Sequence, residues 1–441
     1  MSSPSSPDPA PGTVRARVAS RIDTVRLARR ERFVSALWPV PLLFGVAALV
    51  LSRGTVLLDR HDVFGTTLDR VMIRDPETAM TFSSVVASGM LVFLGIVFST
   101  TLVAIQLAGS QYSPRAVRLF LRLRLTKVAL GVFVATFVFA LSTLTEVRPA
   151  QARTHIPSVS LLTLGLLMLA TVVVFLVFAN GTARLLRVQY LVERIAAEAR
   201  PSLVAAFAVG GEVEAAVPTG GSAVRVVTAH APGVLDAVDV ETLATIGRDA
   251  GGWVEVLVPV GSYVGAGTAV AAVHGTEADR DGAVLDCFVL SNERTMLLDP
   301  GFGLRQLVDV ASRALSPAVN DPTTAVQVID RVTDLLGRIA PCPDPPGWYV
   351  DDAGTARVRM PVETFDRLVR LGYTEIIRYG ADAPQVVRRL RASFDALEPR
   401  RGARPSAGLD EVRTLLERAS ADLLPDAFAA VAAEPDVRGL G

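Results

Sequence analysis

One stretch of this sequence, Thr78 to Pro114, contains 37 residues without a single Asp, Glu, Lys or Arg. A helix of about 20 apolar residues crosses the roughly 30 Å hydrocarbon core of a bilayer. In lipid, only helices and closed barrels satisfy all their backbone hydrogen-bonding groups. Three more apolar stretches lie in the first half of the chain, so we expect an integral membrane protein with four transmembrane helices, near residues 33–52, 82–109, 128–145 and 156–183.

The charged residues divide the chain into two halves. Residues 1–200 contain 22 basic and 11 acidic side chains, whereas residues 201–441 contain 22 basic and 33 acidic ones. A basic half with long apolar stretches fits contact with lipid head groups, and an acidic half fits a soluble region. Because the basic residues gather at the predicted membrane edges, we expect the lipid bilayer as a partner and no nucleic acid.

The positions of the basic residues also predict an orientation. Arg15 to Arg32 contains seven arginines, and the loop from Ser110 to Lys127 contains five basic residues and no acidic one. Since positive loops stay on the cytoplasmic side, both termini are expected in the cytoplasm of a bacterium, with four crossings of its inner membrane. The arm 15–32 then either lies on the membrane surface or only orients the first span.

Several classes of chemistry lack the residues that they need. Lys127 is the sole lysine, which excludes a Walker-A lysine, a Schiff-base lysine and a biotinylated or lipoylated lysine in the soluble half. Cys287, Cys342 and the four histidines have no zinc-ligand spacing, and no Ser-His-Asp order or phosphate loop is present. We therefore expect no enzyme, no metal and no cofactor.

The second half reads as a soluble α+β region. Short alternating segments predict strands at Val224–Thr228, Trp253–Val258 and Ala269–His274, with a helix at Asp239–Arg248 among them. Glycines recur at 261 and 267, which is typical of tight turns in a small β-barrel-like part. The expected order is a basic arm 1–32, a four-helix membrane domain 33–200, a linker 201–222, a β-rich domain 223–300, a helical domain 301–400 and a helical tail 401–441.

The second span is the most polar of the four and contains no charge. Ser99, Gln106 and Ser110 fall on one helical stripe, and Thr100 and Gln111 fall on the adjacent one. Polar groups in a membrane face a partner helix or water rather than lipid. One interpretation is hydrogen bonding between helices, helped by the small residues Ser84, Ser88, Gly95 and Ser99; the other is a path lined by hydroxyls and amides.

Two further groups of residues are candidates for binding. The first, at the cytoplasmic edge of the second and third spans, would contact anionic lipid heads or an anion, and consists of Arg115, Arg118, Arg122 and Lys127. The second would form a cytoplasmic ligand site, and consists of Arg305, Asp309, Ser316, Asn320 and Asp321. For the second group, helix capping at Asp321 and an i,i+4 ion pair are the alternative.

Three passages together carry a family resemblance. They are VFSTTLVAIQLAGSQYSPR at 97–115, the glycine turn at 261–267, and FGLRQLVDVASRALSPAVNDPTTA at 302–325. The chain resembles a family of bacterial predicted membrane proteins that carry one domain of unknown function, over roughly residues 30 to 400. The resemblance implies four N-terminal spans and a cytoplasmic domain. It implies no activity and no catalytic residue.

These observations favour a homo-oligomeric channel or transporter for small ions. The second span would line the path, and the cytoplasmic domain would assemble and regulate it. Four spans in one chain leave little room for a path, which is why we expect an oligomer. The alternative is a membrane-anchored sensor or scaffold without enzymatic activity, whose cytoplasmic domain binds a ligand or a protein.

Overall fold

The structure of the protein is a computed structural model, which describes residues 37–61, 75–111, 124–146, 157–185, 187–208, 224–275, 281–296, 298–351, 353–402 and 404–439. It divides into two compact units. Residues 29–191 form one of them, the membrane unit, and residues 1–28 with 192–441 form the other, the C-terminal unit. The predicted arm 1–32 lies outside the described residues, as does most of the predicted linker 201–222.

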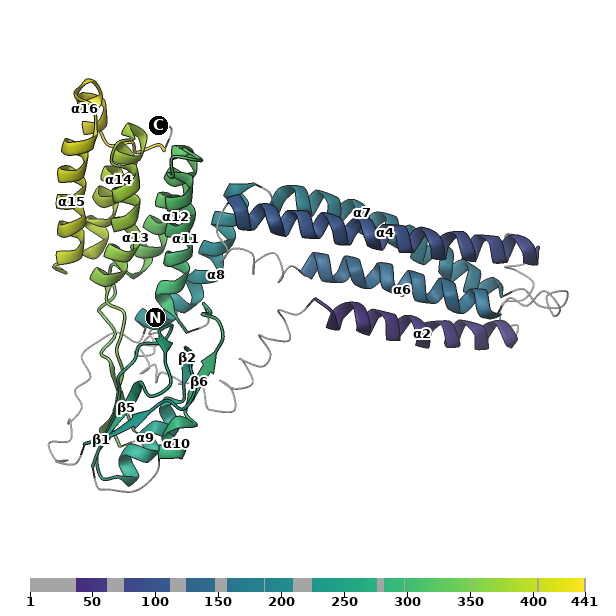
Figure 1. The fold of residues 1–441 in the computed structure, drawn as a ribbon, viewed down its shortest axis with the longest axis horizontal. Helices are drawn as coiled ribbons and strands as arrows, with labels where there is room; N and C mark the ends of the chain where they lie inside the picture. Colours follow the sequence, from purple (N-terminus) through teal and green to yellow (C-terminus); the bar gives the residue numbers. More distant parts are fainter. Residues whose placement is uncertain are drawn as a thin grey trace, which may run out of the picture. The chain divides into compact units, whose positions relative to one another are not determined.

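Four helices of the membrane unit, among the described residues, are long and apolar enough to cross a bilayer. They are α2 (Pro39–Arg60), α4 (Pro76–Gln111), α6 (Arg124–Glu146) and α7 (Ser158–Leu185) (Figure 1). α6 packs against each of the other three, and half of its most apolar segment is buried. The four predicted spans are confirmed, with α6 as the central helix.

Aromatic side chains fill the described interior of this bundle. The Phe93 ring meets the Phe175 ring edge to face, with centroids 5.2 Å apart, and Phe133 is fully buried beside them. Gly131 lies directly on the Phe44 ring, which brings α2 and α6 close together. The Thr136 and Thr171 hydroxyls, 3.0 Å apart, bond to each other in this interior and join α6 to α7.

The first span differs from the predicted one. α2 begins at Pro39 and continues to Arg60, beyond the predicted end at residue 52, so it contains the charged residues Arg53 and Asp59. The physical reason is a partner in another helix. The Asp59 carboxylate accepts hydrogen bonds from the backbone N–H groups of Val159 (2.8 Å) and Ser160 (3.1 Å) at the start of α7, where the helix dipole favours a negative charge.

The chain leaves the membrane unit through a second helix rather than a loop. α7 ends at Leu185, and α8 runs from Val188 to Ala208 with Pro201 inside it. We predicted that the helix would end near Arg200 and that Pro201 would begin a linker. Burial explains the difference, because Leu203 and Phe207 beyond the proline are buried and hold the last turns in place.

The β part of the C-terminal unit consists of two sheets and two short helices. The predicted strands and helix are confirmed as β1 (Val224–Thr228), β3 (Trp253–Val256), β5 (Ala269–His274) and α9 (Val240–Asp249). The further elements are β2 (Gly233–Val238), β4 (Tyr263–Val264), α10 (Asp281–Leu285), β6 (Phe288–Ser291), β7 (Trp348–Val350) and β8 (Ala356–Arg359). The strand orders are β1-β5-β3-β8-β7 and β4-β2-β6, so the described strands form no closed barrel.

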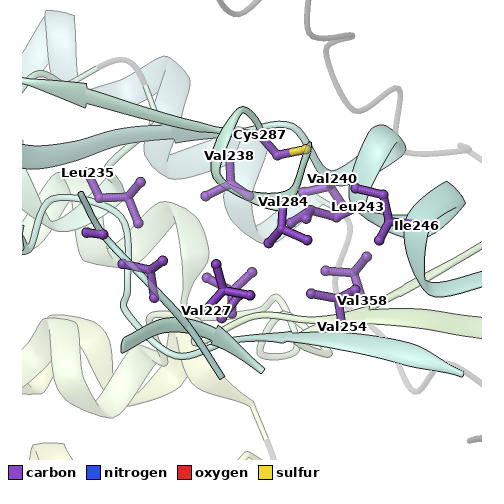
Figure 2. Packing of buried hydrophobic residues seen from close by; sticks show 14 of the residues in the cluster. Val227, Leu235, Val238, Val240, Leu243, Ile246, Val254, Val284, Cys287 and Val358 are labelled. Carbon is purple, nitrogen blue, oxygen red and sulfur yellow. The ribbon is translucent and has the colours of Figure 1, made fainter. Parts of the chain in front are cut away.

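Gly261 and Gly267 serve the predicted turns, with φ angles of +87° and +82° that L-residues with a side chain rarely adopt. The core of the β part lies between the sheets and α9. Val240, Leu243 and Ile246 of α9 face Val254 and Val358 of the larger sheet (Figure 2).

One strand pair crosses the predicted boundary at residue 300. β7 and β8 form an antiparallel hairpin, and β8 also pairs in parallel with β3, with Val254 opposite Val358. A hairpin from the helical region thus completes the sheet of the β region. The two regions therefore share one sheet.

The rest of the C-terminal unit is helical. Its elements are α11 (Pro300–Ala314), α12 (Pro322–Ile339), α13 (Phe365–Gly380), α14 (Pro384–Leu397), a 3-10 turn (Pro399–Arg401), α15 (Ala407–Leu423) and α16 (Asp426–Ala433). α11 to α15 stand side by side (Figure 1). Inside them, the fully buried Tyr373 hydroxyl lies 2.6 Å from Ser393 Oγ and 3.1 Å from Thr333 Oγ1. This hydroxyl network links α12, α13 and α14.

Candidate functional site

Several polar residues of α4 lie on the outside of the bundle, although Ser83 is fully buried. Successive residues of an α-helix are about 100° apart around its axis. By this spacing, one group of α4 residues falls within an arc of about 60°. The buried Val86, Met90 and Val97 occupy the opposite side of the helix. The small and polar residues in this arc are called the outer stripe below. They are Thr81, Ser84, Ser88, Gly95, Ser99 and Gln106, all of which are exposed, and the exposed Leu102 lies in the same arc.

This placement bears on both interpretations of the second span. Ser84, Ser88, Gly95 and Ser99 face away from α6 and α7, so they do not join α4 to its own bundle. Thr100 lies about 100° from Ser99 and donates its hydroxyl to the Ile96 carbonyl at 2.8 Å. Thr100 is thus outside the outer stripe, although its side chain is also exposed.

Some of the candidate residues lie where the structure describes no side chain. Ser110 and Gln111 belong to the last turn of α4 by their backbone only, and Arg115, Arg118 and Arg122 lie outside the described residues. Their assignment to a path or to lipid heads stays a prediction.

Lys127 is described and is buried. It lies in the first turn of α6 with 5% of its surface exposed, beside the equally buried Thr126. A lysine on a lipid head group extends its ammonium into the interface. The burial within this unit leaves little of Lys127 for such a contact, which stays a prediction.

Arg305 and Asp309 are brought together, and a third residue joins them. Arg305 Nε donates to Asp309 Oδ1 at 2.8 Å, and both terminal nitrogens of Arg305 bond the two carboxylate oxygens of Glu375 on α13. These bonds to Glu375 raise the pKa of Arg305 above its ordinary value. The guanidinium is thus fully engaged in joining α11 to α13, and sequence reasoning missed Glu375 because it lies 70 residues away.

The other three residues of that candidate site lie at the far end of α11. Arg305 precedes the end of α11 at Ala314 by about 13 Å along the helix axis. Beyond that end, Ser316 donates to the Arg313 carbonyl at 2.7 Å, and Asp321 caps α12 by accepting from Thr324 N at 3.1 Å. Asn320 adopts a left-handed φ of +49°, which asparagine tolerates better than most residues. The five residues do not converge on one site.

A second ion pair holds the glycine turn. Asp299, which is 3% exposed, caps α11 and pairs with Arg294. A Cβ at Gly261 would lie 2.0 Å from Asp299 Oδ2. The Asp299–Arg294 ion pair therefore packs directly on the glycine backbone, where a side chain would not fit. Glu363 lies near this cluster, and burial raises its pKa. In the described part of the chain, no three His, Cys, Asp or Glu side chains gather as a metal site would require.

Four apolar helices followed by a soluble region of helices and small mixed sheets define the class: this is a polytopic membrane protein with a large soluble portion. Within that class, residues 34–396 match the model of the family described as "Predicted membrane protein (DUF2254)". The chain belongs to this family, whose description gives no function, and the family resemblance stated from the sequence is confirmed.

Similar proteins are known from mycobacteria. The chain is 32% identical over 401 residues to an uncharacterized protein of Mycobacterium bovis and, equally, to one of Mycobacterium tuberculosis. Each alignment covers 85% of this chain and 74% of the relative. No solved structure matches the chain.

Proposed function

We propose that this protein is a homo-oligomeric channel or transporter for small ions in the bacterial inner membrane. The single observation that carries the proposal is the outer stripe of α4, whose polar side chains face away from the bundle of their own chain. Several copies that turn these stripes toward one axis would enclose a path lined by hydroxyls and amides.

Hydrogen bonding supports this arrangement over plain contact with lipid. A serine or threonine hydroxyl can bond a carbonyl of its own helix, as Ser88 does with Ser84 O at 2.9 Å. A glutamine amide has two donors and a carbonyl acceptor, and leaving them in hydrocarbon is costly. Gln106 is exposed near the end of the apolar segment, so water or a neighbouring copy is the more favourable surrounding. Because the stripe is uncharged, it fits small ions rather than large charged solutes.

α8 supports regulation by the C-terminal unit. It follows α7 after two residues, and within the C-terminal unit it is fixed to α12 by the pairs Glu193–Arg331 (2.8 Å) and Arg200–Asp334 (3.5 Å). A helix held in this way transmits a displacement of α12 toward α7 better than a loop would. We therefore assign gating to the C-terminal unit and transmission to α8.

The test is ion flux in liposomes that contain the purified full-length protein. K⁺, Na⁺ and Cl⁻ fluxes are measured for the wild type, for Gln106→Leu and for the conservative control Gln106→Asn. We expect flux in the wild type, a severalfold lower flux in Gln106→Leu, and a value near wild type in Gln106→Asn. Equal flux in all three proteins would show that the outer stripe does not line the path.

A second function is favoured by the same helix α8. A sensor or scaffold would also use a stiff connection between the spans and a soluble region that binds a ligand or a protein. Absence of flux under varied voltage, pH and membrane tension, together with a specific partner captured from detergent or a ligand-induced thermal shift, would favour this alternative over the channel.

The proposed orientation can be tested with a native cysteine. Cys342 is partly exposed in the C-terminal unit, whereas Cys287 is buried. If the C-terminal unit is cytoplasmic, a membrane-impermeant thiol reagent labels Cys342 only after the cells are lysed. Labelling of intact spheroplasts would place this unit on the opposite side of the membrane.

A further inference from the structure

α16 is an apolar helix that presents its side chains to the outside. Of its eight residues, only Ala432 is buried. Phe428 is 50% exposed and Val431 51%, and Leu423 at the end of α15 is 54% exposed. Exposed apolar surface of this kind, gathered on one short element, marks interaction sites more often than isolated apolar residues do.

The backbone around α16 is fixed while its side chains stay outside. Three arginines of α14 donate to main-chain carbonyls in and after the helix: Arg391 to Ala432 O, Arg388 to Glu434 O at 3.1 Å and Arg389 to Asp436 O at 2.7 Å. The Asp436 N–H donates back to Arg388 O at 3.1 Å. These bonds hold the segment against α14 without covering Phe428 or Val431.

The charged residues around α16 indicate which kind of partner could cover its exposed apolar side chains. The exposed charged residues from Ala421 to Gly439 are Asp422, Asp426, Glu434 and Arg438, so the rim is acidic. An acidic rim is repelled by anionic lipid head groups and by the same rim of a second copy. It attracts a segment that is apolar on one face and basic around it.

The sequence of this chain contains such a segment in its N-terminal arm. Between Arg15 and Arg32 there are seven arginines and two acidic residues. Val18, Ile22 and Val25 follow the i, i+4, i+7 spacing with which helical segments dock an apolar face. The arm and α16 also both lie outside residues 34–396, the part that matches the family.

We propose that the apolar face of α16 is the docking site of the arm Arg15–Arg32 of this chain. Val18, Ile22 and Val25 would cover Phe428, Val431 and Leu423, and arginines of the arm would pair with the acidic rim. This assignment competes with contact between the arm and the membrane surface, and it does not depend on the proposed ion path.

The test uses the full-length protein in bilayers that contain anionic lipid. A photo-reactive benzoylphenylalanine replaces Phe428 in one variant and the 71% exposed Tyr263 of the β part in a control. After illumination, mass spectrometry identifies the cross-linked partner. We expect peptides from residues 15–32 with the probe at position 428 and not at position 263.

Each other result has a defined meaning. Cross-links from position 428 to lipid, to α16 of a second copy, or to no part of the arm would overturn the proposal.

A second set of variants tests the recognition itself while keeping the probe in place. One variant combines Asp422→Lys, Asp426→Lys and Glu434→Lys, and a separate variant has Ile22→Asp. Each variant should lower the amount of cross-link to the arm severalfold. Unchanged cross-linking in both would also contradict the assignment.

Discussion

Ala199 of α8 packs so closely on Gly303 of α11 that a Cβ atom added at Gly303 would lie 2.1 Å from the Ala199 Cβ. Ala199 is 1% exposed, so neither side has room to move. Since α8 follows α7 after two residues, this contact fixes the helix that follows the last apolar span against α11 of the C-terminal unit.

Enlarging this contact should loosen α8. Gly303→Val forces two packed helix backbones apart, and overpacking of this kind costs about 1–3 kcal/mol. We expect a lower midpoint of thermal unfolding for the full-length protein in detergent, and altered regulation of any flux. Gly301→Ala on the same helix is the control, since its nearest neighbour atom would be 3.4 Å away. Equal midpoints for the two variants would contradict the packing argument.

Asp59 should stabilise the membrane unit by capping α7. Besides the two backbone N–H groups, it accepts the Ser160 hydroxyl at 2.6 Å. Asp59→Ala removes the acceptor of the two backbone N–H groups, and loss of an N-cap costs about 0.5–2 kcal/mol. We expect reduced thermal stability in detergent, measured by size-exclusion chromatography after heating, with exposed Glu77→Ala as control. Stability equal to that of the control would mean that the cap contributes nothing.

Tyr373 should make the C-terminal unit sensitive to alkaline pH. Burial raises the pKa of Tyr373 from 10.0 to about 12. As the pH rises above 10, the unfolded chain releases this proton first, so the stability that burial of the neutral phenol provides is lost between the two values. Tyr373→Phe should lose less stability over this range, while the exposed Tyr263→Phe should behave as the wild type. Parallel pH profiles of unfolding for all three proteins would refute the prediction.

Ionisation of Glu363 should destabilise the fold, whereas ionisation of a well-paired carboxylate stabilises it. Burial raises its pKa, and Arg367, 3.5 Å away, lowers it less. The unfolded chain therefore releases the proton first as the pH rises, and ionised Glu363 destabilises the fold near neutral pH. Glu363→Gln should raise the unfolding temperature at neutral pH and lose this advantage in acid. Glu241 is exposed, so Glu241→Gln should show no such pH dependence. If both variants had the same pH profile of unfolding temperature, burial of Glu363 would not be the cause.

The local elements were predictable from the sequence because their signals are local. Apolar stretches of sufficient length gave the four helices, and alternation with glycine turns gave β1, β3 and β5. Asp321 followed by Pro322 gave the start of α12, as its capping bond to Thr324 confirms.

The remaining features depend on residues far apart in the sequence. Asp59 meets Ser160 across 101 positions, and β3 pairs with β8 across a similar distance, so no local pattern announces either contact. The direction of the outer stripe needed the structure as well. Periodicity groups Ser99 with Gln106, but only packing decides which side of α4 faces α6.

If the outer stripe of α4 lines a path, its side chains meet water, and a cysteine placed on the stripe reports this contact. Ser99→Cys is introduced after Cys287 and Cys342 have been replaced, and the reconstituted protein is treated with a membrane-impermeant thiol reagent. Leu176→Cys on α7 is the matched control, because it is 62% exposed and, like Ser99, lies eight residues before the end of its apolar segment. We expect labelling at position 99 and none at position 176. Protection of both positions would place the stripe against lipid or protein and exclude the proposed water-filled path.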